Sequence, residues 1–197
     1  MKFATLATAV MIAASTVAAN AKELRLSAAP PPGSAWGAVT QKFADKVAEL
    51  SGGELTVKAY MGSKLGGEQD VVKQIARGRI DMGVMSNTAM SQLIPEFSLL
   101  ASPYAFDSAE QFDCVADNHL LTTFEEEFEA AGIKTVSWME VGYQVIFSQS
   151  EIRRPADLEG VKIRTAPSPT DTRYIQLAGG SAVPLAPKDA VPAMKVG

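Results

Sequence analysis

The sequence has very few residues of the kinds that build disulfides, metal sites and catalytic triads. Its 197 residues include one cysteine, Cys114, and one histidine, His119. A single cysteine forms no disulfide within the chain, so the fold must rest on its apolar core. A lone imidazole argues against a metal site and against a serine or cysteine triad. Both residues fall in one helical pattern, and we expect Cys114 to be a small buried residue and His119 to be a surface or half-buried one.

The sequence also lacks an excess of positive charge. Its 18 lysines and arginines face 22 aspartates and glutamates, a net charge of −4. Loss of Lys2 with the N-terminal segment described next leaves 17 basic residues and a net charge of −5. This balance argues against nucleic acid and against an anionic membrane surface as partners.

Long hydrophobic runs are missing as well. The apolar run Leu6–Ala14 is too short for a membrane span, which needs about 20 residues, and this argues against the alternative of an N-terminal anchor. It follows Lys2 and precedes the cleavage pattern Ala19-Asn20-Ala21, the order found in secretory signals. We therefore predict that residues 1–21 are a signal peptide, removed before Lys22, and that the protein is exported to the periplasm.

The usual catalytic and phosphate-binding motifs are absent too. The sequence contains neither G-x-S-x-G nor H-E-x-x-H, and the pairs Gly52-Gly53 and Gly66-Gly67 fit no phosphate loop and are expected to be turns. We expect no cofactor and no bound metal.

What the sequence does contain is an alternation of strand and helix patterns. Strands are expected at 24–26, 55–59 and 80–85, the last apolar at nearly every position, as a buried parallel strand is. Between them we predict a helix that Ser34 caps and that Gly52 and Gly53 end, and a second helix that carries Val71, Val72 and Ile75 and ends at Arg77-Gly78. Strands separated by helices of this length indicate an α/β fold with a parallel sheet. A longer helix is predicted over 108–131, with Glu125–Glu127 on its solvated face.

After Gly132 the pattern changes. Further strands are expected at 133–139, 143–148, 161–164 and 181–185, and helices near 171–177 and 188–195. We predict a first α/β domain over 22–132 and a second over 133–197. Because the last helix ends at Gly197 with nothing after it to pack against, we expect the second domain to be truncated at its C-terminus.

Arg164 is the sharpest candidate for a functional residue. On a strand of period two, Val161 and Ile163 face one side while Lys162 and Arg164 face the other. Arg164 stands at the strand's carboxyl end, where ligands bind in open α/β sheets. Its guanidinium can hold a carboxylate bidentately, which lysine cannot do. The alternative is an ordinary surface arginine.

Three stretches then point to a family. The runs "PADLEGVKIRTAPSP", "LGGEQDVVKQIARGRIDMGVMS" and "PEFSLLASPYAF" closely resemble the extracytoplasmic solute-binding subunits of TRAP transporters, the tripartite ATP-independent periplasmic family, of the DctP type. The resemblance covers essentially all of 22–197. It implies a flytrap fold in which two α/β domains enclose a cleft and close on a ligand by a hinge motion.

The resemblance also implies roles for single residues. Arg164 matches the arginine that forms the main salt bridge to the ligand's carboxylate. A second ligand-binding arginine often stands two residues after a glycine, but here Gln144 follows Gly142. Glutamine can hydrogen-bond the ligand without adding charge, which speaks against a dicarboxylate such as succinate or malate.

Four further residues resemble cleft positions, and two of them, Glu68 and Trp36, also have a plainer interpretation. Glu68 matches a ligand contact from the first domain or is an acid favoured in the first turn of a helix. Ser86 and Asn87 follow the third strand and resemble cleft-lining positions. Trp36 is either an aromatic wall of the cleft or a helix residue packed on the sheet.

The resemblance implies a monomeric binding protein that captures a small carboxylate-bearing solute and delivers it to the membrane permease subunits of a TRAP transporter. The alternatives are the solute-binding subunit of an ATP-driven (ABC) transporter, which shares the architecture, and an exported enzyme acting on an organic acid. The missing nucleophile, base and metal motifs argue against the enzyme.

Overall fold

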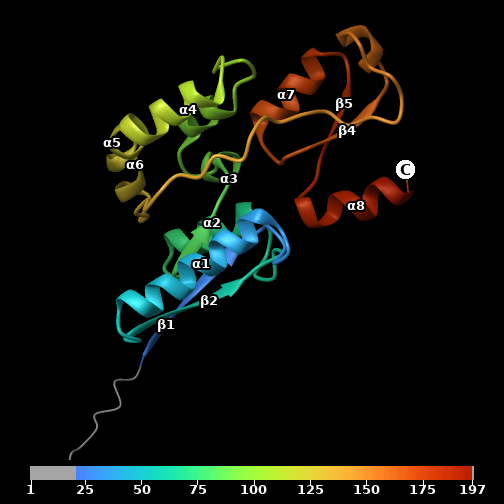
Figure 1. The fold of residues 1–197 in the computed structure, drawn as a ribbon. Helices are drawn as coiled ribbons and strands as arrows, with labels where there is room; N and C mark the ends of the chain where they lie inside the picture. Colours follow the sequence, from blue (N-terminus) through green and yellow to red (C-terminus); the bar gives the residue numbers. More distant parts are fainter. Residues whose placement is uncertain (1–20, 197) are drawn as a thin grey trace, which may run out of the picture.

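The structure is a computed structural model in which residues 21–196 are described (Figure 1). The expected signal peptide lies, apart from Ala21, outside the described residues. No helix in the described part of the chain has the length and apolar character needed to cross a membrane.

The N-terminal half forms a parallel sheet with the strand order β2-β1-β3. Its strands are β1 (Lys22–Ala28), β2 (Leu55–Tyr60) and β3 (Met82–Val84). The helices α1 (Ala35–Leu50) and α2 (Glu68–Ala76) make the two crossovers. This confirms the predicted βαβ units, whose core lies around Leu26, Ala28 and Met61.

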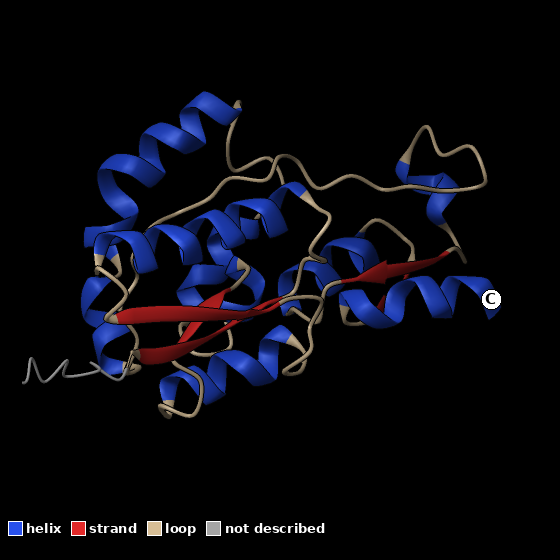
Figure 2. Cartoon of the chain, turned by 60° about the horizontal axis from the view of Figure 1, so that its bottom comes forward, coloured by secondary structure: helices blue, strands red, loops and turns tan. Residues whose placement is uncertain are grey.

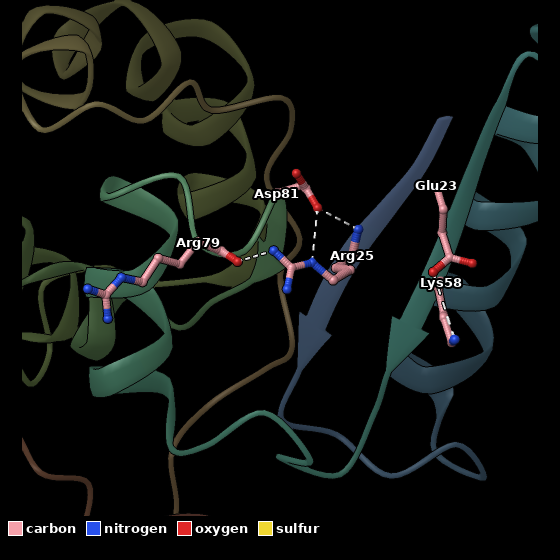
Figure 3. A network of polar contacts seen from close by, with 5 residues as sticks. All are labelled: Glu23, Arg25, Lys58, Arg79 and Asp81. Atoms are coloured by element: carbon pink, nitrogen blue, oxygen red, sulfur yellow. Dashed lines mark hydrogen bonds and ion pairs between the residues drawn. The ribbon is translucent and has the colours of Figure 1, made fainter. Parts of the chain in front are cut away.

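The strand expected over 80–85 is shorter than predicted. At its start, the side chain of Asp81 takes the place of a backbone carbonyl as the hydrogen-bond acceptor for β1. A carboxylate oxygen of Asp81 accepts the backbone N–H of Arg25 at 2.8 Å, and the Arg25 guanidinium bonds the carbonyl of Arg79 (Figure 3). The N–H of Arg25 is therefore not free for a ladder bond to the backbone beside it. Pairing with β1 begins only at Met82.

Ser34 caps α1 as predicted, with its hydroxyl accepting the N–H of Gly37 at 3.1 Å. The buried face of α1 is made by small residues, Gly37, Thr40 and Ala44, while Val39 is 49% exposed. Glycine lets the first turn approach the proline-rich loop before it, because a Cβ at Gly37 would collide with the carbonyl oxygen of Pro31 and lie 2.7 Å from that of Pro32.

We predict that Gly37→Ala destabilises the protein, although alanine is the better helix former by about 1 kcal/mol. The added methyl meets two backbone carbonyls that cannot move without shifting the loop, and such overpacking typically costs about 1–3 kcal/mol. Urea denaturation followed by circular dichroism measures the change. Gly33→Ala is the matched control, because no heavy atom lies within 4 Å of its Cβ. A Gly37→Ala variant as stable as the parent contradicts the prediction.

The region after β3 is mostly helical but interrupted. The elements are α3 (Asn87–Met90), the 3-10 helix η1 (Pro95–Ala101), α4 (Ala109–Val115), a π-helical turn (Ala116–Leu120), α5 (Leu121–Thr123) and α6 (Glu125–Ala130). The prediction of one continuous helix over 108–131 was wrong. The π turn adds a residue to the helix, and Phe124, with φ −112° and ψ 15°, interrupts it where its ring packs on Phe97.

Side chains of this region partly follow the predictions. Cys114 is exposed, so the expectation of burial was wrong. The buried positions are Ala116 and Leu120, and Phe112 packs on Phe106 with ring centroids 5.1 Å apart. Cys114 lies two residues from both Phe112 and Ala116 and therefore points to the other face. His119 and Glu125–Glu127 are exposed, as predicted.

The strands predicted over 133–139 and 143–148 are not formed. This segment runs without regular structure from α6 toward the C-terminal half (Figure 1), and it is exposed from Met139 to Glu151. Alternation alone makes no strand, because a strand needs a neighbour for its backbone groups, and none in residues 21–196 pairs with it. Trp138 is half-buried because it stacks on Phe97.

The C-terminal part holds a second, two-stranded parallel sheet made of β4 (Lys162–Thr165) and β5 (Ser181–Pro184). Its helices are the 3-10 turn η3 (Pro155–Leu158), α7 (Pro169–Leu177) and α8 (Pro187–Val196). The strands of the two sheets extend roughly along one line (Figure 2). The mixed α/β character is confirmed, and the division at 132/133 stays a prediction.

Candidate functional site

Arg164 is the next-to-last residue of β4, and the chain leaving β5 fixes its guanidinium. Nε and Nη2 both donate to the carbonyl oxygen of Leu185, at 2.8 and 2.6 Å. Leu185 follows β5 directly, so the parallel register brings it alongside Arg164. The other edge of the guanidinium, formed by Nη1 and the second N–H of Nη2, makes no hydrogen bond within residues 21–196. That edge has the geometry to hold a carboxylate bidentately.

Two carboxylates act on this guanidinium. Partial burial lowers the pKa of Arg164, whereas the negative charges of Asp171 and then Glu68 work in the opposite direction. Because the ordinary pKa of arginine lies far above neutral pH, the group stays positive at physiological pH. An anion arriving here meets one fixed positive charge flanked by two negative ones.

Asp171 was not among the predicted site residues. It lies in the first turn of α7, whose N-cap is the buried Ser168. The Ser168 hydroxyl accepts the N–H of Asp171 at 3.2 Å and donates to its carboxylate at 2.8 Å. The run Ser168-Pro169-Thr170-Asp171 fits the capping pattern S/T-x-x-D/E, so the sequence did contain a signal for this residue.

Glu68 approaches Arg164 from the other sheet. It is the first residue of α2 and lies next to Ser86, which follows the carboxyl end of β3. Glu68 is only 8% exposed. One carboxylate oxygen accepts the backbone N–H of Ser86 at 2.9 Å, and the other lies 3.0 Å from the Ser86 hydroxyl. Glu68 of α2 and Arg164 of β4 therefore interact electrostatically, although they lie at different sheets.

The pKa of Glu68 is raised, because burial disfavours its charged form. The two hydrogen bonds from Ser86 and the positive charge of Arg164 lower it, but by less than burial raises it. A carboxyl whose folded pKa lies above its unfolded value stabilises the fold most below the unfolded pKa, and this stability is lost as the pH rises through the folded pKa. The ionised Glu68 is therefore a net cost to folding at neutral pH.

We accordingly expect Glu68→Gln to increase the free energy of unfolding at pH 7.5, because it removes a buried charge. The amide can keep both contacts to Ser86 without a buried charge. The gain should shrink toward pH 4, where Glu68 is largely protonated in both the folded and the unfolded state. Urea denaturation at the two pH values measures it, with the exposed Glu129→Gln as control. A loss of stability that is equal at both pH values contradicts the expectation.

Ser86 and Asn87 are placed by the start of α3. The Ser86 hydroxyl caps this helix by accepting the N–H of Ala89 at 3.2 Å, and it lies 2.9 Å from the Thr88 hydroxyl. The side-chain oxygen of Asn87 accepts the N–H of Thr88 at 2.9 Å. Ser86 thus belongs to the Glu68 cluster, and Thr88 is a further member that sequence reasoning missed.

Trp36 and Gln144 are not joined to this cluster. Trp36 is half-buried in the first turn of α1, where its carbonyl accepts the hydroxyl of Thr40 at 2.8 Å. Gln144 is exposed in the irregular segment after α6, and no hydrogen bond in the described part of the chain links it to Arg164. The structure therefore brings together Arg164, Glu68 and Ser86, with Asn87 adjacent.

The surroundings of the site offer no metal-binding set, since residues 21–196 contain no group of three or more His, Cys, Asp and Glu side chains placed to hold an ion. An open groove lies beside the site, between the start of α7 and the end of β5, but it is lined by residues such as Pro167, Thr172 and Pro184 and by none of the six predicted ones. The chemistry available is anion pairing at Arg164 and hydrogen bonding at Glu68.

Comparison with known proteins identifies the family of this chain. Residues 26–197 match the profile of the bacterial extracellular solute-binding proteins of family 7, DctP. The 2,3-diketo-L-gulonate-binding periplasmic protein YiaO of Escherichia coli is 30% identical over 146 residues, which is 74% of this chain and 44% of that protein. The chain spans about half the length of the curated relatives it matches.

Solved structures agree. A TRAP periplasmic solute-binding protein of a Sulfitobacter species with bound β-D-galacturonate is 26% identical, with a TM-score of 0.83 over 89% of this chain and 59% of that one. A TRAP solute-binding protein of Ralstonia eutropha with bound (S)-2-acetolactate is 29% identical, with a TM-score of 0.84 over 89% and 57%. The flytrap α/β fold is confirmed, and the relatives are binding proteins rather than enzymes. The chain belongs to the DctP family of bacterial extracellular solute-binding proteins, the family of the TRAP transporter subunits.

Proposed function

We propose that the protein captures a small carboxylate-bearing solute outside the cytoplasm and delivers it to the membrane subunits of a TRAP transporter. The observation that carries this is the free edge of the Arg164 guanidinium, fixed in place by the Leu185 carbonyl. A ligand carboxylate that paired with this edge would leave the guanidinium fully hydrogen-bonded. A ligand without the carboxylate would leave a partly buried charge unpaired on closure, a penalty of several kcal/mol.

The other side of the site favours an acid that also carries hydroxyl groups. Glu68 lies beside the first sheet, and its carboxyl oxygens keep lone pairs that can accept from a ligand hydroxyl, while Gln144 adds no second positive charge. The relatives described above hold galacturonate and acetolactate, each of which combines one carboxylate with at least one hydroxyl group. We infer a monocarboxylate of this kind as the ligand, bound by a monomer in the periplasm and enclosed by a hinge motion that contacts from both domains stabilise.

The relatives give no support to the alternative that the protein serves an ATP-driven transporter, because they are TRAP solute-binding proteins. Delivery to a TRAP permease has its own test in the neighbouring genes. Two membrane subunits without an ATPase support the proposal, and an adjacent ATPase gene contradicts it.

Ligand capture is tested by purifying the protein as the cell exports it and identifying any co-purified solute by mass spectrometry. Calorimetric titrations with D-galacturonate, D-glucuronate and (S)-2-acetolactate then measure affinity, with the matching neutral sugar D-galactose as control. We expect at least one acid to bind and the neutral sugar not to bind. A protein that carries no acid and binds none of the three contradicts the proposal.

A further inference from the structure

The buried contacts of Glu68 form a short chain of hydroxyl groups that can reverse its direction. The second oxygen of the carboxyl lies 3.0 Å from the Ser86 hydroxyl, which in turn lies 2.9 Å from the Thr88 hydroxyl, and either hydroxyl can be the donor in that pair. The Ser86 oxygen also accepts the N–H of Ala89 at 3.2 Å. Thr88 is 5% exposed, so the chain is closed off from bulk water.

In both protonation states of Glu68, the carboxyl and the Ser86 hydroxyl keep their hydrogen bonds. When Glu68 is ionised, Thr88 donates to Ser86 and Ser86 donates to the carboxylate. When Glu68 is protonated, its O–H donates to Ser86 and Ser86 donates to Thr88. In each state the Ser86 oxygen accepts two hydrogen bonds and donates one, which is its full capacity. The carboxyl can therefore gain a proton without leaving itself or Ser86 unpaired, which would cost about 1–3 kcal/mol.

The charges around Glu68 are few. The helix α2 packs on β3 and α3, and neither carries a titratable side chain. Through Val72 it also shares a buried cluster with Phe97 of η1 and Phe128 of α6, whose glutamates are exposed to solvent. Within residues 21–196 the charge that acts on Glu68 is that of Arg164 on β4, and it favours the ionised carboxylate. The other acid beside Arg164 is Asp171 on α7, which is only half-buried and hence better screened by solvent than Glu68.

A ligand carboxylate changes this balance. It would cancel the positive charge that holds Glu68 ionised, and it would bring a third carboxylate to one guanidinium. Like charges at close range disfavour ionisation, and the group that yields is the one whose burial already disfavours its charge. Glu68 is that group, since it is the more deeply buried of the two acids.

We propose that binding of an anionic ligand at Arg164 is accompanied by uptake of one proton from solvent. The residue that receives the proton is Glu68, because the hydrogen bonds that join it to Ser86 and Ser86 to Thr88 can reverse direction. This inference rests on the proposed function, because it requires a carboxylate to bind at Arg164. The complex then contains Arg164, Asp171, the ligand anion and a neutral Glu68. A neutral Glu68 is also a hydrogen-bonding group that does not repel the ligand.

The pH dependence follows from the direction of the proton. Where Glu68 is ionised in the free protein and protonated in the complex, affinity rises as the pH falls, by up to about tenfold per pH unit when uptake is complete. Below the pKa of Glu68 in the free protein no proton is taken up, and the dependence levels off.

The proton is counted by calorimetry of D-galacturonate, D-glucuronate or (S)-2-acetolactate binding in phosphate and in Tris at one pH, since the two buffers differ in ionisation enthalpy. We expect uptake at neutral pH in the parent protein and in the control Glu159→Gln, whose glutamate is exposed. Glu68→Gln should show none. Binding without uptake in the parent, or unchanged uptake in Glu68→Gln, overturns the inference while leaving the proposed function intact.

A second measurement needs no ligand. Carbon-13 NMR of the glutamate carboxyls follows the titration of Glu68 in the parent and in Arg164→Gln, which removes the same charge that a bound carboxylate would cancel. We expect the Glu68 midpoint to move to higher pH in the variant. An unmoved midpoint overturns the inference even if none of the acids binds, and failure of all three acids to bind counts separately against the proposed function.

Discussion

Arg164→Ala is expected to weaken carboxylate binding by about 30-fold or more in the exported protein. Truncating one partner of a buried, hydrogen-bonded charge pair costs about 2–5 kcal/mol, and about 1.4 kcal/mol corresponds to a factor of ten in affinity. The variant should lose ligand binding without unfolding, because the substitution removes the guanidinium and leaves the backbone of β4 unchanged. Isothermal titration calorimetry with whichever acid the parent binds measures it.

Arg164→Lys should fall between the parent and the alanine variant. Lysine keeps the charge but offers no planar fork, so it cannot hold the Leu185 carbonyl on one edge and a carboxylate on the other. Lys162→Ala is the matched control, since Lys162 is a cation two residues earlier on the same strand and is exposed. Thermal denaturation of each variant confirms that it is folded. Equal affinities in Arg164→Ala and the parent would contradict the proposed pairing of Arg164 with the ligand carboxylate.

The position of Arg164 was readable from the sequence, but its surroundings were not. The alternation from Val161 to Arg164 and the turn after it placed a guanidinium at the carboxyl end of a strand. Its anchor, the carbonyl of Leu185, lies 21 residues further along the chain. A backbone carbonyl has no sequence signature, and the contact depends on the register of β4 against β5. Such pairing is a tertiary property that local patterns do not specify.

Elements set by local chemistry were predicted well. The cap of α1 at Ser34 and the parallel order of β1, β2 and β3 follow from capping residues and apolar periodicity. The failures occur where distant contacts override local preference. Asp81 shortens β3 by bonding Arg25, Phe124 interrupts a helix by packing on Phe97, and the alternating residues after Gly132 find no strand to pair with among those described.

The candidate site shows the same division. Glu68 and Ser86 were expected near the ligand on separate grounds, and the structure shows that they are one hydrogen-bonded unit 18 residues apart in sequence. Gln144 was expected beside them through the family resemblance. Its segment is exposed in the described structure, so its role in ligand binding stays a prediction.

The aromatic cluster around Phe97 carries the largest stability prediction. Phe97 is fully buried, and its ring lies 5.1 Å from Phe124 and 5.4 Å from Phe128, both edge-on, and 5.3 Å from the stacked ring of Trp138. These residues come from η1, the α5–α6 boundary, α6 and the segment that leads to the second sheet. One side chain thus joins elements that share no strand pairing.

We expect Phe97→Ala to lower the free energy of unfolding by about 3–5 kcal/mol, the usual cost of emptying a large aromatic site. That is a large part of the roughly 5–15 kcal/mol by which proteins of this kind are stable. Guanidinium denaturation followed by circular dichroism measures the loss. Leu99→Ala on the same 3-10 helix is the control, because Leu99 is 65% exposed and should change stability by less than about 0.5 kcal/mol.

Tryptophan emission of Phe97→Ala distinguishes a local from a general effect. If the stack with Phe97 holds Trp138, emission in the folded variant should shift toward that of solvent-exposed indole, with Trp36 contributing an unchanged component. A variant that loses little stability and keeps the emission of the parent would show that Phe128 and its neighbours suffice to hold Trp138. In that case the irregular segment between the two sheets would be anchored independently of η1. The hypothesis that Phe97 links the two halves of the chain would then be wrong.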